Sequence, residues 1–213
     1  MSSGSRTRLE PAQRRAQILR HAVRVFREQP YSEVSLDQIA TETGVTRGLL
    51  HHYYGSKRNL YLDVLRTVLT IPNSTPIVPP GVQGDLREVL DACVRTWMQL
   101  VRQAGGLWPG SPGAGTGMAE DDVDEVVRSA RDVLVERMLV EVPFPESLDR
   151  DALRAALRSY SAFAGMAIHE WLDGGPLDEA QTQVLLRETL LALAERVVPQ
   201  MSEMSGMSHT PAG

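Results

Sequence analysis

The chain has 213 residues, 42% of them hydrophobic but only 5% aromatic, and a formal net charge of −5. This length suits one or two domains with a substantial core, and no apolar run approaches the roughly 18 residues that a membrane span requires. The single cysteine, Cys93, excludes an intramolecular disulfide, and the N-terminus lacks the apolar segment of a signal peptide, so we expect a cytoplasmic protein.

Charge is unevenly distributed along the chain. Residues 1–70 hold 11 Lys and Arg against 6 Asp and Glu, a net charge of +5, whereas residues 71–213 hold 11 against 21, a net charge of −10. An acidic soluble surface would explain the second part but not the division. A basic N-terminal part favours a nucleic-acid partner, with the acidic part facing away from it.

Residues 1–10 are small, polar and basic, and we expect a flexible arm. A helical pattern follows from Pro11 to about Arg27, and Gln29-Pro30-Tyr31 ends it. Its apolar positions fall on one side, as expected of a helix that closes a small core: Ile18, Leu19, Ala22, Val25 and Phe26.

The stretch 34–57 has the spacing of two short helices around a tight turn. Ser35 is placed to cap the first helix, with Gln38 completing a capping box. Gly44 supplies the left-handed residue that ends this helix, and Thr46 caps the next, from Arg47 to about Tyr53. This pattern predicts a helix-turn-helix.

In the second helix of this pair, Leu50 and Tyr54 point toward the core. Arg47 is then free to bind the O6 and N7 acceptors of a guanine, and Leu49 to contact a thymine methyl group. A further helix, capped by Ser56 and beginning at Lys57, offers free backbone N–H groups to a phosphate.

On these residues the segment, over about residues 11–70, resembles the DNA-binding domain of TetR-type (tetracycline-repressor-like) transcriptional regulators. The family pattern is met by Ser35, Ile39-Ala40, Gly44-Val45-Thr46, Leu50-His51-His52-Tyr53-Tyr54 and Ser56-Lys57. Where the family most often carries Thr-Leu-Tyr, this chain has Leu49-Leu50-His51, so a hydroxyl and a phenol are missing. The resemblance implies DNA contacts from Ser35, Thr46, Arg47, Gly48, Leu49, His51, His52, Tyr53 and Lys57.

The remainder of the chain also has helical periodicity, and we expect an all-α protein. A helix from Lys57 to about Thr70 joins the two parts, and a linker rich in Pro, Asn, Ser and Thr follows at 72–84. Further helices are predicted over 85–103, 121–141, 149–172 and 177–198. The GAGTG within 105–118 matches neither Walker nor Rossmann spacing, so we reject a nucleotide site.

The expected domains are an arm at 1–10, a three-helix helix-turn-helix domain with its connecting helix at 11–70, a helical effector-binding and dimerisation domain at 71–200, and a disordered tail at 201–213. Apolar residues of the last helix cover more than one stripe, which a two-fold four-helix interface would bury. The resemblance implies a homodimer through the last two long helices. Alternatively, both faces are internal core.

The resemblance also implies a small-molecule inducer within the C-terminal half. Residues with suitable chemistry are Cys93, Trp97, Trp108, Met138, Tyr160, Phe163, Met166 and His169. Each of these residues is also a common core residue, so the sequence leaves pocket and core both open.

No catalytic or metal-binding constellation is evident, since the adjacent His51 and His52 project about 100° apart on a helix. We therefore expect no enzyme, no cofactor and no membrane partner. The prediction is a ligand-responsive transcriptional regulator that binds a palindromic double-stranded DNA operator as a homodimer, with repression the expected output and activation open. The alternatives are a helical small-molecule-binding or catalytic protein that retains only the N-terminal fold, and a non-specific architectural DNA-binding protein.

Overall fold

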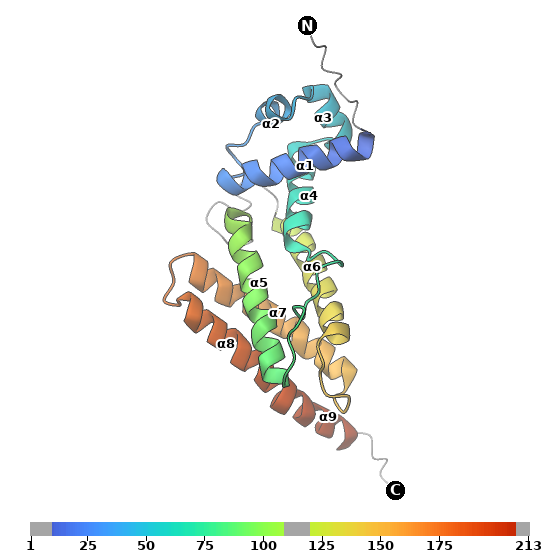
Figure 1. Ribbon diagram of the computed structural model, residues 1–213, viewed down its shortest axis with the longest axis vertical. Coiled ribbons are helices and arrows are strands. Elements are labelled where there is room, and N and C mark those ends of the chain that lie inside the picture. Colours follow the sequence, from blue (N-terminus) through green and yellow to red (C-terminus); the bar gives the residue numbers. More distant parts are fainter. Residues whose placement is uncertain (1–9, 109–119, 208–213) are drawn as a thin grey trace.

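The computed structural model describes residues 10–108 and 120–207, and within these ranges it contains helices and no strand, which confirms the all-α prediction (Figure 1). A small helical head is formed by α1 (Pro11–Glu28), α2 (Leu36–Thr43) and α3 (Arg47–Tyr54), and α4 (Lys57–Leu69) leads from it into a larger helical body. The body consists of α5 (Leu86–Ala104), the short 3₁₀ turn η1 (Gly105–Leu107), α6 (Glu120–Glu141), α7 (Arg150–Leu172), α8 (Glu179–Ala192), the π-helical turn η2 (Leu193–Val197) and α9 (Val198–Met207).

Local capping explains where most of these helices begin. The side chains of Asp85, Asp149 and Asp178 accept hydrogen bonds from backbone N–H groups in the first turns of α5, α7 and α8. Asp178 and Gln181 form a complete capping box. The predicted capping box at Ser35 is wrong in one respect, because the side-chain oxygen of Gln38 does not accept the N–H of Ser35, and the amide nitrogen of Gln38 donates to Glu42 at 3.1 Å.

Ser35 itself caps α2 as predicted, since its hydroxyl oxygen accepts the N–H of Asp37 at 3.2 Å. Gln38 and Glu42 are four residues apart on the exposed surface of α2, a spacing at which two side chains of one helix meet.

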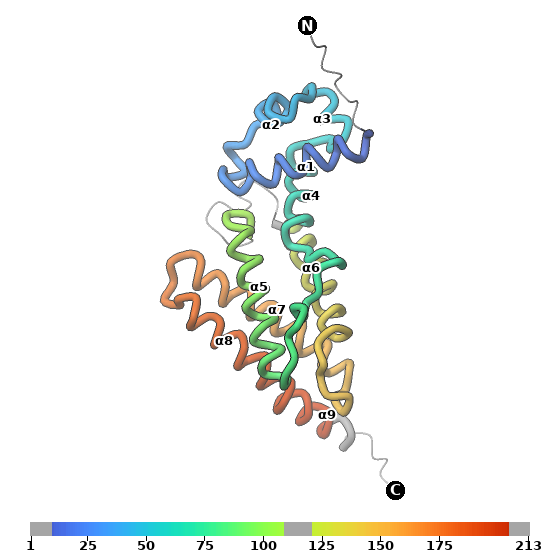
Figure 2. The backbone as a smooth tube through the Cα atoms, in the orientation of Figure 1, coloured from blue at the N-terminus to red at the C-terminus, as the bar shows by residue number. Residues whose placement is uncertain are grey.

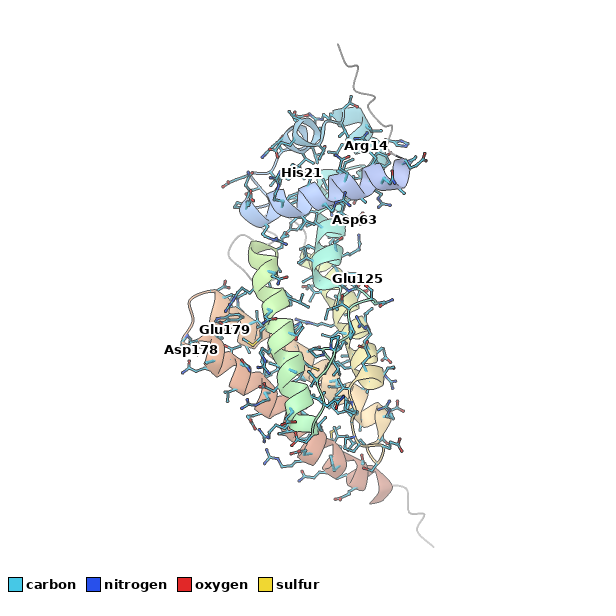
Figure 3. All side chains as sticks on the ribbon, viewed as in Figure 1. Arg14, His21, Asp63, Glu125, Asp178 and Glu179 are labelled. Carbon is cyan, nitrogen blue, oxygen red and sulfur yellow. The ribbon has the colours of Figure 1, made fainter. Side chains whose placement is uncertain are left out.

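The head has its own hydrophobic core, which we call the N-terminal core. Side chains on α1, α2, α3 and α4 interdigitate there, with Ile18, Ile39, Leu50 and Leu60 fully buried. An ion pair at 2.8 Å between Arg15 and Asp63 joins α1 to α4, and Figure 3 shows Asp63 on α4 beneath α1.

Two residues of the body, Leu107 in η1 and Val126 in α6, also belong to the N-terminal core. These two residues lie beyond the expected division near residue 70 and yet pack in the head. The domain boundaries remain a prediction. A second cluster, the C-terminal core, is built from α5, α6, α7, α8 and α9. It contains Leu90, Val101, Leu153 and Ile168, each less than 1% exposed.

The segment between α4 and α5 runs down the body and lies beside α6 (Figure 2). Arg137 of α6 holds it there, donating to the carbonyl oxygens of Ile71 at 3.0 Å and Thr75 at 2.7 Å. The carboxylate of Glu141 accepts the N–H of Ile77 at 2.7 Å, and its ion pair with Arg137 lowers its pKa. The linker is therefore fixed by two side chains of one helix.

The last helix of the body continues further than predicted. η2 and α9 prolong α8 without interruption, and α9 contacts α7, so the expectation of a disordered tail from residue 201 is wrong for residues 201–207. Residues 208–213 lie outside the described residues, as do 1–9, where the flexible arm was expected, and 113–117, which carry the GAGTG sequence.

Candidate functional site

The turn between α2 and α3 sets the angle at which α3 leaves the head. Gly44 has a φ of 67°, in the left-handed region that glycine adopts with little strain. Its N–H donates to the carbonyl of Thr41 at 3.1 Å, and the N–H of Val45 donates to Ala40 at 3.0 Å. These bonds satisfy the last carbonyl groups of α2 and turn the chain back onto it.

Three contacts fix the rotation of α3 about its axis. The Thr46 side chain accepts the N–H of Leu49 at 3.2 Å, Leu50 and Tyr54 are buried in the N-terminal core, and the Tyr54 hydroxyl donates to the carbonyl of Arg15 at 2.8 Å. The opposite side of α3 is exposed. We call this exposed set the α3 face: Arg47, Gly48, Leu49, His51 and His52.

Figure 1 shows α2 and α3 at the opposite end of the molecule from α9. A Cβ added to Gly48 would meet no protein atom within 4 Å, so packing within the chain does not require glycine there. Glycine at this position leaves the backbone of α3 open to close approach from outside. The α3 face therefore has the room that an elongated partner such as a duplex needs.

The remaining residues of the predicted DNA set lie around the α3 face. Ser35 and Thr46 use their hydroxyl oxygens as caps, which leaves each O–H able to donate to a phosphate. Tyr53 is half-buried, and its ring lies 5.6 Å from that of His52 in an edge-on arrangement.

Arg47 makes an ion pair that the sequence analysis missed. Its guanidinium donates to the carboxylate of Asp37 on α2 at 2.7 Å, and both side chains are more than half exposed. An exposed pair of this kind contributes about 0–1 kcal/mol, so exchanging Asp37 for a base costs little. No spacing rule relates two residues on separate helices, so nothing in the sequence indicated the pair.

Lys57 is turned toward the loop that follows α1. Its ammonium donates to the carbonyl of Ser32 at 3.4 Å and lies 4.5 Å from the centroid of the Tyr31 ring. Partial burial lowers the pKa of this ammonium. Lys57 lies in the first turn of α4, where Ser56 caps the helix by accepting the N–H of Asn59 at 3.1 Å, so its ammonium would add charge to the free N–H groups of this helix start if a phosphate replaced the Ser32 carbonyl.

Two neighbouring cavities lie in the body. The smaller, of about 80 Å³, lies between α5, α6, α7 and the linker, and the larger, of about 350 Å³, lies between the end of α4, α5, α6 and α7. Trp97, Leu134 and Ser161 line both. We call them the apolar cavity and the larger cavity.

Most of the residues predicted to bind an effector line these two cavities. Cys93, Trp97, Met138 and Tyr160 line the apolar cavity, and Trp97, Trp108, Met166 and His169 line the larger one. Phe163 lines neither and is 38% exposed on α7. Helical periodicity cannot separate such positions, because an apolar side chain that lines a cavity and one that packs in a core have the same spacing.

The polar groups of the apolar cavity are held in neutral form. Burial raises the pKa of the Cys93 thiol to about 11. The Tyr160 hydroxyl donates to the carbonyl of Leu186 at 3.0 Å, and burial raises the pKa of this phenol as well. Neither group carries charge at neutral pH, so this cavity suits an apolar group.

The larger cavity contains a charged residue that the sequence analysis missed. Arg131 of α6 lines it together with Val127 and Leu134, and these three positions follow the i, i+4, i+7 spacing of one helix face. The position of Arg131 between apolar residues of one helix face was the sequence signal for a cavity-lining charge. Its charge by itself favours a position in solvent, so the sequence did not single it out.

Among the described residues, no three His, Cys, Asp or Glu side chains gather as a metal ion would require. In the same part of the chain, none of the helices combines the length and apolar character of a membrane span.

Comparison with known proteins places these features in context. Residues 18–64 match the model for bacterial regulatory proteins of the tetR family. The HTH-type transcriptional regulator BetI of Rhizobium meliloti (strain 1021) is 31% identical over 87 residues, which cover 41% of this chain and 42% of that protein. An HTH-type transcriptional repressor of Streptomyces coelicolor is 30% identical over 83 residues, 38% of this chain and 43% of that protein. The chain therefore matches less than half the length of these relatives.

Most of the chain resembles a solved structure of a tetR-family transcriptional regulator from Streptomyces coelicolor. The TM-score is 0.65, the sequence identity 23%, and the match covers 92% of this chain and 87% of the other. At this level of identity the likeness shows a shared fold.

Proposed function

From the match of residues 18–64 to the model for bacterial regulatory proteins of the tetR family, we propose that this chain belongs to that family and regulates transcription by binding duplex DNA. The observation that supports the proposal is the α3 face. Its exposed residues lie on a helix that is fixed by a capped turn and by the buried side chains of Leu50 and Tyr54. Arg47 supplies the forked donor that reads guanine, and Leu49 an apolar contact for a thymine methyl group. The protein acts in the cytoplasm as a binding protein, and occupying a promoter represses transcription by obstructing the polymerase.

The proposed functional unit is a homodimer joined through α7 and α8. Both helices carry large apolar side chains that the single chain leaves exposed, Phe163 and Met166 on α7 and Val184 and Leu185 on α8. Such a surface is usually an interaction site. A two-fold dimer presents two α3 helices to successive major grooves about 34 Å apart, so the operator is an imperfect palindrome.

We propose that a small-molecule effector in the larger cavity releases the DNA. Two contacts link this cavity to the head. Leu69 at the end of α4 lines the cavity and packs against the N-terminal core, and Leu107 is buried in that core while its neighbour Trp108 lines the cavity. An effector that displaces either contact changes the relative position of the two α3 helices, and linkage then requires DNA to weaken effector binding by the same factor.

A mobility-shift titration with DNA from upstream of the protein's own gene tests the DNA-binding proposal. Arg47→Ala is expected to weaken binding by roughly 1 to 3 kcal/mol and to relax base preference, whereas Lys57→Ala weakens binding evenly across sequences and flattens its salt dependence. Arg95→Ala, which removes an exposed arginine of the body, is the matched control and leaves binding unchanged.

Absence of a shift at every salt concentration would contradict the proposal and favour a helical small-molecule-binding protein that keeps only the N-terminal fold. Equal effects of Arg47→Ala and Arg95→Ala on DNA binding would show that the α3 face does not contact the DNA.

A further inference from the structure

The larger cavity contains a guanidinium, that of Arg131, for which the described part of the chain supplies no acidic partner. Among the residues that the structure describes, Arg131 makes neither an ion pair nor a hydrogen bond. By contrast, Arg128 on α6 pairs with Glu125 at 2.9 Å, and Arg158 on α7 pairs with Asp132 at 3.1 Å. Arg131 therefore differs from Arg128 and Arg158 in having no carboxylate partner among the described residues.

The position of this guanidinium depends on a glycine. Gly165 lies opposite on α7, and a Cβ built there would come within 2.9 Å of Nη2 of Arg131. The side chain thus rests against the backbone of α7 and is half-buried at the cavity wall. Holding an unpaired cation there costs free energy that an anion would recover.

The other walls of the larger cavity are mostly apolar, and no Asp or Glu of the described residues lines it. The rings of Trp97 and Trp108 meet edge to face with centroids 5.6 Å apart. Beyond Trp97 the apolar cavity begins, and none of the described residues that line it is charged. The imidazole of His169, which lines the larger cavity, contacts the carboxylate of Asp173 through Nδ1.

From this arrangement we propose that the effector is an amphipathic organic acid, with one carboxylate bound to Arg131 and an apolar body lying against Trp97 and Trp108 toward the apolar cavity. The inference rests on the proposed function, because it names the chemical class of that effector. A guanidinium binds a planar carboxylate through two parallel hydrogen bonds. One cation between apolar walls balances a single negative charge, whereas a phosphate dianion would leave charge uncompensated.

Tryptophan fluorescence titrations of the full chain without DNA test this proposal. The probes are straight-chain carboxylates from hexanoate to tetradecanoate and phenylbutyrate, each compared with the alcohol of the same skeleton. The carboxylates are expected to bind at least about tenfold more tightly than their alcohols, the difference that a charge-assisted hydrogen bond provides.

Arg131→Gln is expected to remove this preference and leave alcohol binding unchanged. Gly165→Ala, which displaces the guanidinium, is expected to reduce the preference. Arg128→Gln on the same helix, which removes an exposed and already paired arginine, keeps it.

Three outcomes would overturn the proposal: no carboxylate binds, acids and alcohols bind equally, or Arg131→Gln binds acids as the original protein does. Tighter binding of phenyl phosphate than of phenylbutyrate would also overturn the assignment to a carboxylate. A mobility shift with the same protein preparation separates this failure from failure of the proposed function, because DNA binding without effector does not need Arg131.

Discussion

Arg47 is the residue on which the proposed DNA reading most depends, and in the free chain it is paired with Asp37. Asp37 has two opposing effects on DNA binding. Its carboxylate holds the guanidinium near the α3 face, but it also places a negative charge where phosphates are expected to approach. The second effect dominates, because an exposed ion pair contributes little and repulsion of phosphates is the longer-ranged interaction.

Asp37→Asn is therefore expected to raise DNA affinity by about threefold to tenfold and to make the affinity fall more steeply with salt. Fluorescence anisotropy with one labelled duplex at several salt concentrations measures both. Glu125→Gln removes an exposed carboxylate from the body and serves as the control. Unchanged or weaker binding by Asp37→Asn would mean that the carboxylate positions Arg47 more than it repels DNA.

Cys93 illustrates how burial decides the chemistry of a residue that sequence alone leaves open. Burial raises the pKa of its thiol to about 11, so the neutral thiol persists through physiological pH. Because this pKa is raised by folding, the corresponding contribution to stability is present below the pKa of the unfolded thiol and is lost as pH rises toward 11.

Iodoacetamide is accordingly expected to modify Cys93 slowly in the folded protein at pH 8, and faster as pH approaches the raised pKa. Mass spectrometry of timed samples follows the reaction, and the same protein in denaturant, where alkylation is rapid, is the reference. Complete modification of the folded protein at the denatured rate would show a reactive thiol and contradict its burial.

At the scale of elements, η1 is the short segment that joins the body to the head. Gly105, with a φ of 57°, ends α5 and turns the chain, and Gly106 lies close to the backbone of Arg27 at the end of α1. These turns direct Leu107 into the N-terminal core, where it is fully buried. A three-residue turn from the body thus completes the core of the head.

Leu107→Ala is expected to destabilise the protein by about 2–5 kcal/mol, since it leaves a cavity in the N-terminal core. Amide hydrogen exchange should show the loss of protection mainly in α1 and α4. Leu153→Ala, an equally buried leucine of the C-terminal core, should loosen α7 and α8 instead. The same exchange pattern for both variants would contradict the assignment of Leu107 to the head.

For the whole molecule, the exposed apolar residues of α7 and α8 set the expected assembly. They lie on the two helices that run side by side at one flank of the body (Figure 1), away from α2 and α3. A contact between two copies at this flank would leave both α3 faces open. The distribution of charge agrees with a dimer whose α3 faces stay open to DNA, because the basic residues concentrate in the head.

Leu185→Glu is expected to weaken self-association by at least about tenfold, because it places a carboxylate in the proposed apolar interface. Sedimentation velocity over a range of concentrations measures the monomer–dimer equilibrium. Val140→Glu alters a valine that is 82% exposed on α6 and should leave the equilibrium unchanged. A monomer in the unaltered protein, or a dimer unaffected by Leu185→Glu, would rule out this interface.

The sequence by itself determined the helices and the local chemistry of the turns. Gly44, Thr46 and Ser56 end or begin helices as predicted, and Leu50 and Tyr54 face the core. These signals could be read because capping and helical periodicity act within about one or two turns of the chain. The return hydrogen bond of Gln38 was mispredicted because its side chain pairs with Glu42, four residues further along α2.

Only the tertiary structure decided which distant residues meet. It placed Arg131 against Gly165 beside the larger cavity, Leu107 in the N-terminal core and Asp37 against Arg47, while it left Phe163 at the surface. Each of these positions depends on how separate helices pack against one another. Side-chain spacing along one helix specifies the face on which a residue lies but not the helix or the cavity that this face meets.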